Sequence, residues 1–369
     1  MKESNDYLTK QIITYLGNKR SLLGFINKSV ELVKHELGQE KISTFDVFSG
    51  SGIVSRFLKQ HSTVLYTNDL EDYSKTINTC YLTNKKQINQ KELNKWYSWL
   101  TEKLDDNHLM NNGFIRRLYA PKDDNNIQDG ERVFYTTRNA KYIDTARTLL
   151  EEVPEPYKTL LLAPLIYEAS VKNNTGGVFK GFYKNSETKR GQFGGNAKNA
   201  LTRILADIKL EKPILSNYEC EVHVLQGDSN IVCKDLPLVD LAYLDPPYNQ
   251  HPYSSNYFML NLINNYIEPE TISKVSGIPV GWNKSNYNVK SEALSSLNSL
   301  VSNINAKYLL ISFNSEGYIS YDEMVSMLKQ YGTVRTFDKE YNTFRACRNL
   351  NNRSLHVKEY LFLLRKEGF

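Results

Sequence analysis

The chain has 369 residues, enough for one large domain or two unequal domains with a sizeable hydrophobic core. Hydrophobic residues make up 40% and charged residues 24%, values of ordinary soluble globular proteins that exclude a disordered chain, a collagen-like fibre and a membrane bundle. The net charge of +5 is too small to indicate a nucleic-acid partner by itself, so the positions of the basic residues matter more than their sum.

The cysteines and the N-terminus exclude further classes. Cys80, Cys220, Cys233 and Cys347 form no C-x-x-C pair and have no histidine cluster beside them, so we expect reduced thiols, no disulfide framework and no metal site. Residues 1–10 are polar, and no run approaches the roughly 18 apolar residues of a membrane span. We therefore expect a cytoplasmic protein without a membrane partner.

Short runs rich in β-branched and aromatic residues predict seven buried strands. These runs are residues 42–48, 63–67, 221–226, 239–244, 307–313, 333–337 and 358–365. Helical patterns separate most of them, at residues 21–37, 255–266, 291–303 and 321–331. This alternation predicts an α/β fold with a mainly parallel, doubly wound, Rossmann-like sheet. The last two strands have no helix between them, so we expect an antiparallel hairpin at or near the sheet edge.

The first predicted strand runs into a glycine turn, after which a helix is expected to begin near Ile53. The turn consists of Phe48, Ser49, Gly50, Ser51 and Gly52. Glycines let backbone N–H groups approach a ligand, and open α/β sheets bind nucleosides at the end of the first strand. Asp69 ends the next strand, where a carboxylate accepts hydrogen bonds from ribose hydroxyls. Together these features predict a nucleoside site, although the glycine turn alone also suits a simple strand-to-helix connection.

The alternation of strands and helices fails between about residues 84 and 213, where the chain is polar, Asn-rich and helical in places, as in residues 91–104 and 157–170. A structureless loop of that length is uncommon in a compact protein. We therefore expect an inserted, mainly helical domain at residues 85–213, with residues 1–84 and 214–369 forming a discontinuous second domain.

Basic, glycine and aromatic residues are concentrated in residues 172–203 of this insert. The segment has seven basic residues against one acid, together with six glycines and four aromatic rings. This composition suits a loop that follows phosphates and offers rings to bases, although a charge run is also typical of a solvated face. The candidate nucleic-acid-binding residues are Lys180, Lys184, Lys189, Arg190, Lys198 and Arg203. Arg345, Arg348 and Arg353 are candidates for a second phosphate contact.

The most specific motif is Asp245-Pro246-Pro247-Tyr248, directly after the predicted strand 239–244. From average residue usage it would occur by chance in about one in a thousand chains of this length. The prolines fix a rigid turn and remove two backbone donors, which leaves carbonyls beside a carboxylate and an aromatic ring. Such a turn suits an exocyclic amino group, because Asp245 and the Pro246 carbonyl accept hydrogen bonds from its two N–H groups while Tyr248 stacks on the base. The alternative is a surface turn with an aromatic plug.

In their order along the chain, these motifs closely resemble the Dam-like, α-ordered group of DNA adenine-N6 methyltransferases. The matching segments are residues 15–20 (YLGNKR), 45–52, 68–69, 227–228 and 245–248. The resemblance covers about residues 7–80 and 220–369 and the insert only weakly. It implies S-adenosylmethionine as methyl donor, double-stranded DNA as substrate and a target-recognition role for the insert.

The resemblance also implies which residues bind the cofactor. They are Tyr15, Gly17, Asn18, Lys19, Phe48, Ser49, Gly50, Gly52, Asp69, Asp228 and Ser229. Asp228 sits where the family binds the adenine of the cofactor. In many relatives an aromatic residue follows this acid, but here the next residue is Ser229, which leaves the packing around the cofactor ring open.

The mechanism follows from the chemistry of the amino group. The lone pair of adenine N6 is delocalised into the ring until hydrogen bonds to Asp245 and the Pro246 carbonyl draw the nitrogen toward sp³ geometry. The methyl group then passes in line to nitrogen without a covalent intermediate, and positioning supplies much of the acceleration. Because a base within a duplex cannot reach such a pocket, the target adenine must flip out and stack on Tyr248.

Several alternatives share part of this pattern. An N4-cytosine DNA methyltransferase usually carries Ser at the position of Asp245, and RNA adenine or protein-amide methyltransferases more often carry Asn. A nicotinamide dehydrogenase has no role for the tetrapeptide, and a catalytically silent DNA-binding module would have lost it. We expect a site-specific DNA adenine-N6 methyltransferase. The resemblance to the family, rather than any residue pattern, implies that it is a bacterial or phage modification enzyme of a restriction-modification system. A cognate restriction endonuclease acting independently on the same site is the partner that this setting implies.

Overall fold

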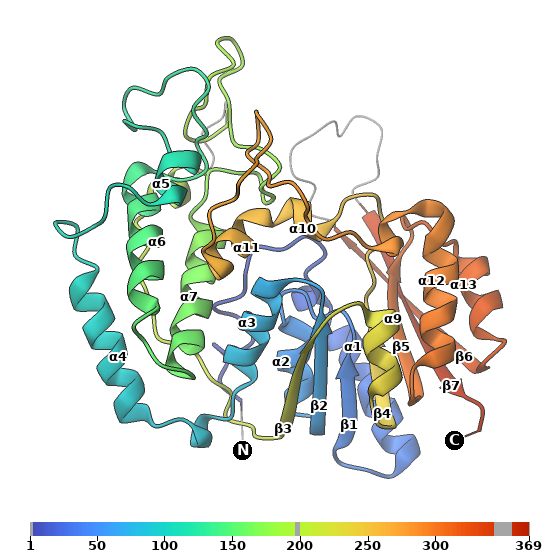
Figure 1. Cartoon of the computed structure of the whole chain (residues 1–369). Helices are drawn as coiled ribbons and strands as arrows, with labels where there is room; N and C mark the ends of the chain where they lie inside the picture. The colour runs from blue at the N-terminus through green and yellow to red at the C-terminus, as the bar shows by residue number, and fades with distance from the viewer. Residues whose placement is uncertain (1–2, 196–199, 343–355, 369) are drawn as a thin grey trace.

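The computed structural model describes residues 3–195, 200–342 and 356–368, and a single seven-stranded sheet forms its centre (Figure 1). The strands are β1 (Ile42–Asp46), β2 (Ser62–Asp69), β3 (Glu221–Gln226), β4 (Val239–Leu244), β5 (Ala306–Asn314), β6 (Gly332–Asn342) and β7 (His356–Lys366). Their order across the sheet is β3-β2-β1-β4-β5-β7-β6. Each strand that the sequence predicts is present, and β6 extends furthest beyond its expected range.

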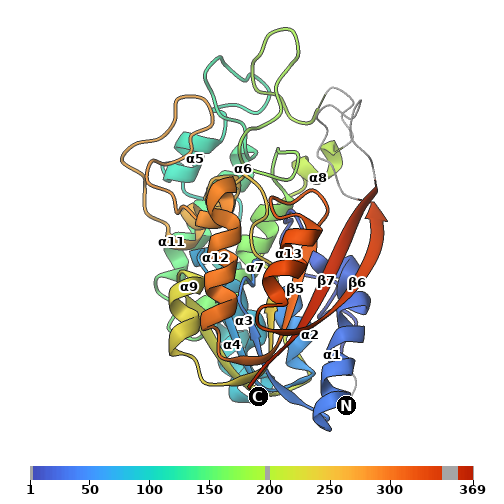
Figure 2. The ribbon, with the colours of Figure 1, turned by 90° about the vertical axis from the view of Figure 1, so that its right-hand side faces the viewer.

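Parallel pairing joins β3, β2, β1, β4 and β5 in turn, whereas β7 runs antiparallel between β5 and β6. The predicted antiparallel pairing of the last two strands is therefore confirmed, with β6 at the edge of the sheet (Figure 2). Because β7 lies inside the sheet, its first residues lie beside the carboxyl end of β5. Glu359 of β7 pairs with Asn314, the last residue of β5.

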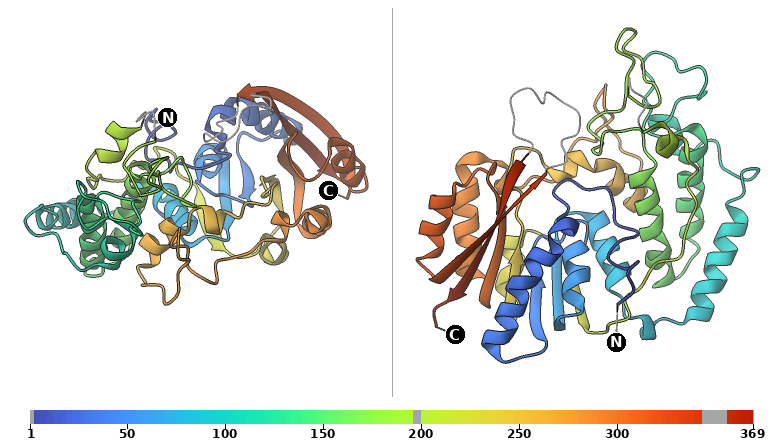
Figure 3. Two further views of the ribbon diagram at one scale, coloured as in Figure 1. Left: turned by 90° about the horizontal axis from the view of Figure 1, so that it is seen from above. Right: turned by 180° about the vertical axis from the view of Figure 1, so that it is seen from behind.

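Alternating side chains explain why helices cover both faces of the sheet. Tyr308 and Leu310 of β5 pack in one apolar cluster with residues of α1 (Leu23–Leu37) and α2 (Ile53–Lys59). Leu309 and Ile311 pack in another with residues of α12 (Lys290–Asn303) and α13 (Tyr321–Leu328). Successive residues of a strand point to opposite faces, so these two clusters lie on opposite sides of the sheet. Seen from behind, α1 lies in front of the strands (Figure 3).

The remaining helices of this part of the chain are short. They are α3 (Asp72–Leu82), α9 (Ser229–Val232), α10 (Tyr253–Asn256) and α11 (Phe258–Asn265). The single helix expected over residues 255–266 is instead the pair α10 and α11, because the backbone leaves the helical region at Tyr257 with φ −124° and ψ 24°. The hydroxyl of Tyr257 accepts a hydrogen bond from the Leu16 N–H at 2.6 Å, which fixes the segment before α1 against this break.

The insert is mainly helical, as expected. Its helices are α4 (Gln90–Lys103), α5 (Phe114–Tyr119), α6 (Thr137–Leu150), α7 (Tyr157–Val171) and α8 (Leu201–Leu205). The central helix α7 is apolar on nearly all sides, as a helix buried among others should be, and it contacts α3, α6 and α11. The apolar core of the insert is therefore continuous with α3 and α11. The hydrophobic core does not break at residues 85 and 213, so these bounds do not separate two packed units. We propose them instead as the bounds of a functional unit.

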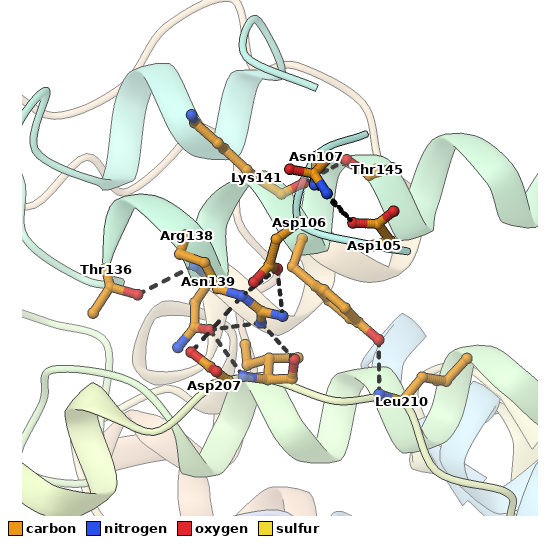
Figure 4. A network of polar contacts seen from close by, with 12 residues as sticks. Asp105, Asp106, Asn107, Thr136, Arg138, Asn139, Lys141, Thr145, Asp207 and Leu210 are labelled. Carbon is orange, nitrogen blue, oxygen red and sulfur yellow. Dashed lines mark hydrogen bonds and ion pairs between the residues drawn. The ribbon is translucent and has the colours of Figure 1, made fainter. Parts of the chain in front are cut away.

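A polar network fixes the end of the insert to α6 (Figure 4). Arg138 forms an ion pair with Asp106 at 2.9 Å and donates to the carbonyl of Ile208 at 2.7 Å. Asn139 accepts a hydrogen bond from the Ile208 N–H at 2.8 Å. The segment that returns toward β3 is thus bound to a helix of the insert.

No helix in the part of the chain that the structure describes is long and apolar enough to cross a membrane. Cys80, Cys220 and Cys233 are buried free thiols, whereas Cys347 lies outside the described residues.

Candidate active site

A cavity of about 980 Å³, partly open to solvent, lies at the carboxyl ends of β1, β2, β3 and β4. The sheet order reverses between β1 and β4, and open α/β sheets bind ligands at such a switch point. Most residues that the sequence assigned to the cofactor or to catalysis line this cavity. They are Tyr15, Gly17, Asn18, Lys19, Phe48, Ser49, Gly50, Asp69, Asp228, Ser229, Asp245 and Pro247. Gly52, Pro246 and Tyr248 lie next to these residues in the chain without lining the cavity themselves.

The glycine turn is bound to the acid that ends β2. The N–H of Gly50 donates to Asp69 Oδ2 at 2.7 Å, and the N–H of Glu71 donates to Asp69 Oδ1 at 2.9 Å. Gly50 has φ +50°, and a Cβ atom there would lie 2.9 Å from the Tyr15 ring. The position therefore requires glycine, both for its backbone angle and for the close approach of the ring. Burial raises the pKa of Asp69, and the backbone hydrogen bonds oppose that shift.

The segment before α1 lies against the Asp245–Tyr248 turn. Gly17 has φ +73°, and a Cβ atom there would lie 2.9 Å from the Tyr248 hydroxyl. The Lys19 ammonium lies 3.1 Å from Asp245 Oδ1 and 5.5 Å from the centre of the Tyr248 ring. The sequence placed this segment at the cofactor by resemblance alone, and the structure brings it also to the Asp245–Tyr248 turn, the candidate catalytic turn.

The catalytic turn itself is held on two sides. The Tyr248 ring packs edge-on against Phe313 at a centroid distance of 5.7 Å, and the Tyr248 carbonyl accepts from the Tyr318 N–H at 3.1 Å. Asp245 is largely buried, with 18% of its side chain exposed. Burial, opposed by Lys19 and reinforced by Glu359, raises the pKa of Asp245 to about 6. The carboxylate is therefore ionised near neutral pH but close to its titration range.

An aromatic residue that the sequence did not single out lines the cavity beside Phe48. Tyr287 packs edge-on against Phe48 at a centroid distance of 5.3 Å, and its hydroxyl donates to Asn230 Oδ1 at 2.7 Å. Both rings lie in the cavity lining beside Asp228 and Ser229. Tyr287 thus brings a ring to the part of the cavity where the resemblance led us to expect an aromatic residue and the chain has Ser229. Its turn, Asn286–Asn288, carries no motif that would have revealed this role.

Glu71 is a second residue in the cavity lining that the sequence did not single out. It accepts hydrogen bonds from the Ser254 hydroxyl and, at 2.6 Å, from the Asn261 amide. These contacts join the end of β2 to α10 and α11, which follow the catalytic turn. Burial raises the pKa of Glu71 to about 7. An acid close after Asp69 was the available signal, but nothing in its spacing predicts a contact with residues 254–261.

The candidate DNA-binding residues differ in their surroundings. Lys180, Lys184, Lys189 and Arg190 are exposed, and Lys184 lies over the Phe182 ring at 5.2 Å. The guanidinium of Arg203 is instead half-buried and donates to the carbonyls of residues 171, 173 and 175, so it shapes the start of the loop. Lys198, Arg345, Arg348 and Arg353 lie outside the described residues.

Comparison with known proteins agrees with this geometry. A family model described as D12 class N6 adenine-specific DNA methyltransferase matches residues 15–327. The chain is 28% identical to the type II methyltransferase M.NlaIII of Neisseria lactamica, over 96% of this chain and 99% of that protein. It is also 28% identical to the type II methyltransferase M.CviAII of Paramecium bursaria Chlorella virus 1, over 95% of this chain and 98% of that protein.

A further relative is longer than this chain. The chain is 28% identical to the modification methylase LlaI of Lactococcus lactis subsp. lactis, over 92% of its own length but only 52% of that protein. The family match extends from the segment before α1 into α13 and so includes the glycine turn, the insert and the catalytic turn. The chain therefore belongs to the D12 class N6 adenine-specific DNA methyltransferases.

Proposed function

We propose that this protein transfers a methyl group from S-adenosylmethionine to N6 of an adenine that is flipped out of duplex DNA. The observation that carries the proposal is that the glycine turn and the Asp245–Tyr248 turn border one cavity. A donor bound along Phe48 to Asp69 would therefore lie next to a base held at Asp245.

The cavity residues fit such a donor. Asp69 is a carboxylate at the end of β2 in the position for ribose hydroxyls, and Phe48 and Tyr287 offer rings to an adenine. Gly17 and Gly50 have no side chain, so Tyr248 and Tyr15 can lie close to the backbone of the cavity lining. A Cβ atom at either glycine would be too close to the tyrosine beside it. When bound, S-adenosylmethionine supplies an electrophilic methyl group on its sulfonium.

The residues of the catalytic turn prepare the acceptor. An ionised Asp245 and the Pro246 carbonyl accept hydrogen bonds from the two N–H groups of the target amino group, which localises the nitrogen lone pair. Tyr248 stacks on the flipped base and fixes its plane. These contacts place the nitrogen for in-line attack, and such positioning accounts for much of the rate of a two-reactant transfer. No covalent enzyme intermediate is required.

Replacing Asp69 by Ala is expected to weaken donor binding by on the order of ten- to hundredfold, because a hydrogen bond to a charged group contributes about 1.5 to 3 kcal/mol. Titration calorimetry with the donor measures this change. Asp72→Ala is the matched control, because Asp72 belongs to the same segment and lies outside the cavity lining. Since Asp69 also accepts from two backbone N–H groups, only a variant with an unchanged melting temperature is informative. Wild-type donor affinity in such a variant would exclude Asp69 from the donor site.

Replacing Tyr287 by Leu is expected to raise the dissociation constant of the donor by roughly tenfold, because an aromatic contact contributes about 0.5 to 1.5 kcal/mol beyond the area that it buries. Tyr287→Phe keeps the ring and removes only the hydroxyl that donates to Asn230. Calorimetry on the two variants separates these contributions. Equal donor affinity of the Leu and Phe proteins would show that the ring does not contact the donor.

The exposed face of residues 172–195 is proposed to contact the DNA backbone. Lys180 lies 3.5 Å from the His251 ring, just after the catalytic turn, and the Phe179 N–H donates to the Asn256 carbonyl at 2.7 Å. No acid among the described residues forms an ion pair with Lys180 or His251 within 4.0 Å. Burial and the Lys180 charge lower the pKa of His251, so the positive charge here is that of the Lys180 ammonium. An ammonium without an acid beside it favours an anion, and a phosphate beside the flipped nucleotide fits this position.

The biological setting is proposed from the relatives. M.NlaIII and M.CviAII are named type II methyltransferases, and LlaI is named a modification methylase. We propose that this protein likewise modifies a specific site, and that a separate restriction endonuclease recognises the same sequence. Digestion of methylated and unmethylated plasmid by lysate of the source cells tests this setting, because only the unmethylated plasmid should be cut.

A further inference from the structure

Three buried charged side chains meet beneath the catalytic turn. The Lys19 ammonium lies 3.1 Å from Asp245 Oδ1 and 2.9 Å from Glu359 Oε1. The side chains of Lys19 and Glu359 are 3% and 1% exposed, so water screens their charges little. The Ser312 hydroxyl donates to the same oxygen of Glu359. Glu359 does not line the cavity, and it reaches the site through Lys19.

The arrangement places one cation between two carboxylates. Burial alone would lower the pKa of Lys19, but the charges of Asp245 and Glu359 raise it well above its usual value, so the ammonium stays charged. The two acids compete for this one ammonium. If Lys19 paired with Asp245 alone, the full positive charge of the ammonium would stabilise the negative charge of Asp245. The Asp245 carboxylate would then be a weaker hydrogen-bond acceptor for the target base.

We propose that Glu359 is a positioning residue of the methyl-transfer site, which shares Lys19 with Asp245 and thereby fixes both the orientation and the basicity of the acceptor carboxylate. The ammonium holds Oδ1 of Asp245, which turns Oδ2 toward the amino group of the target base. This proposal rests on the proposed function, in which Asp245 accepts a hydrogen bond from adenine N6. A carboxylate at the far end of the chain, on β7, thus controls chemistry at the end of β4.

The other ionisable groups around Asp245 do not replace this control. Tyr243 precedes it on β4, Tyr248 follows it in the turn, and Tyr253 faces it from α10. Burial raises the pKa values of Tyr243 and Tyr253 well above their usual range, so both are neutral in the range of the assay. Asp46 of β1 also interacts with Asp245, and burial raises the pKa of Asp46 to about 7. Both acids therefore contribute to the acid limb of the wild-type pH profile. Glu359 acts on the pKa of Asp245, so a shift of this limb in Glu359→Gln reports the change at Asp245.

The test is the pH profile of kcat for the full-length enzyme with saturating S-adenosylmethionine and duplex DNA. In Glu359→Gln, the amide oxygen still accepts from Lys19 but carries no charge. Loss of this charge removes a contribution that raises the pKa of Asp245, so the acid limb should move to lower pH. The plateau of kcat should fall on the order of tenfold, because the acceptor is weaker and less firmly oriented. The melting temperature of each variant is measured in parallel.

A double-mutant cycle separates this role from a structural one. Lys19→Met leaves Asp245 beside Glu359 without the cation, which raises the pKa of Asp245 and moves the acid limb to higher pH. Adding Glu359→Gln to that variant removes the like charge and should restore kcat at neutral pH by on the order of tenfold. The same substitution therefore lowers activity in one background and raises it in the other, which general destabilisation would not do.

Asp240→Asn is the matched control. Asp240 lies on β4, the same strand that leads to Asp245, is also mostly buried and pairs with Lys307 at 2.8 Å, but does not line the cavity. Its loss should leave the acid limb unmoved. A Glu359→Gln protein that matches this control, or that loses activity equally in both backgrounds, would overturn the role of Glu359. A wild-type enzyme that transfers no methyl group to adenine would instead overturn the proposed function.

Discussion

We expect Asp245→Asn to lower the rate of methyl transfer by roughly a hundred- to thousandfold, the range seen when one preorganised hydrogen-bonding group of an active site is removed. The substitution keeps the shape of the side chain but turns one acceptor oxygen into an NH₂ donor, which cannot accept from adenine N6. Lys19 would then contact an uncharged group and pair with Glu359 alone. Single-turnover kinetics with labelled donor measure the chemical step directly.

Donor affinity provides the control for this variant. Asp245 contacts the acceptor more than the donor in the proposed geometry, so calorimetry should give a donor affinity close to that of the wild type. A variant that binds the donor and transfers methyl groups at the wild-type rate would show that Asp245 has no role in the chemistry. Loss of donor binding together with activity would instead place Asp245 in the donor site.

The second large effect is expected at the DNA-facing loop. Changing Lys180, Lys184, Lys189 and Arg190 together to Ala should weaken binding to all duplexes by roughly tenfold or more. The salt slope should fall by about one for each phosphate that the variant no longer neutralises. If Arg190 contacts a base edge, its single change should cost about 1 to 3 kcal/mol and relax the preference at one position of the recognition site. Duplex affinity at several salt concentrations separates the two kinds of contact.

A matched set of lysines controls for the loss of charge. Lys86, Lys91, Lys95 and Lys103 are exposed and belong to α4 or to the turn before it. Helix α4 lies at the lower left of the molecule, away from the loop of residues 172–195 at its top (Figure 1). Changing these four to Ala removes the same number of charges and should leave the salt slope unchanged. Equal effects of the two sets would mean that only the net charge of the insert matters, and that target recognition lies elsewhere.

The sheet could be predicted because its signals are local. Runs such as residues 239–244 are apolar apart from Asp240, as expected of strands covered on both faces, and helical patterns separate them. The absence of a helical pattern between the last two predicted strands was enough to predict their antiparallel pairing. The break at Tyr257 could not be predicted in this way, because residues 253–266 contain neither Gly nor Pro and the contact made by Tyr257 is with Leu16, far away in the sequence.

The candidate site was predictable where a motif carries it and obscure where tertiary contacts build it. The Asp245–Tyr248 turn and the glycine turn follow strands that pair in parallel, so their meeting follows from the fold. Tyr287 reaches the site from an irregular segment between α11 and α12. Glu359 reaches it because the register of β7 pairs this residue with the end of β5. An acid within the apolar run of residues 358–365 was a visible signal, since buried acids are rare unless paired. Its partner Lys19 could be identified only once the sheet order was known.

The most direct test of the account is to identify the methylated base. The enzyme is incubated with duplex DNA and S-adenosylmethionine carrying a labelled methyl group, and the DNA is then digested to nucleosides and separated by chromatography. We predict that the label elutes with N6-methyl-2′-deoxyadenosine and that Asp245→Asn yields almost none. Label in N4-methyl-2′-deoxycytidine, or no label in DNA from the wild-type enzyme, would contradict the assignment of adenine N6 as the acceptor.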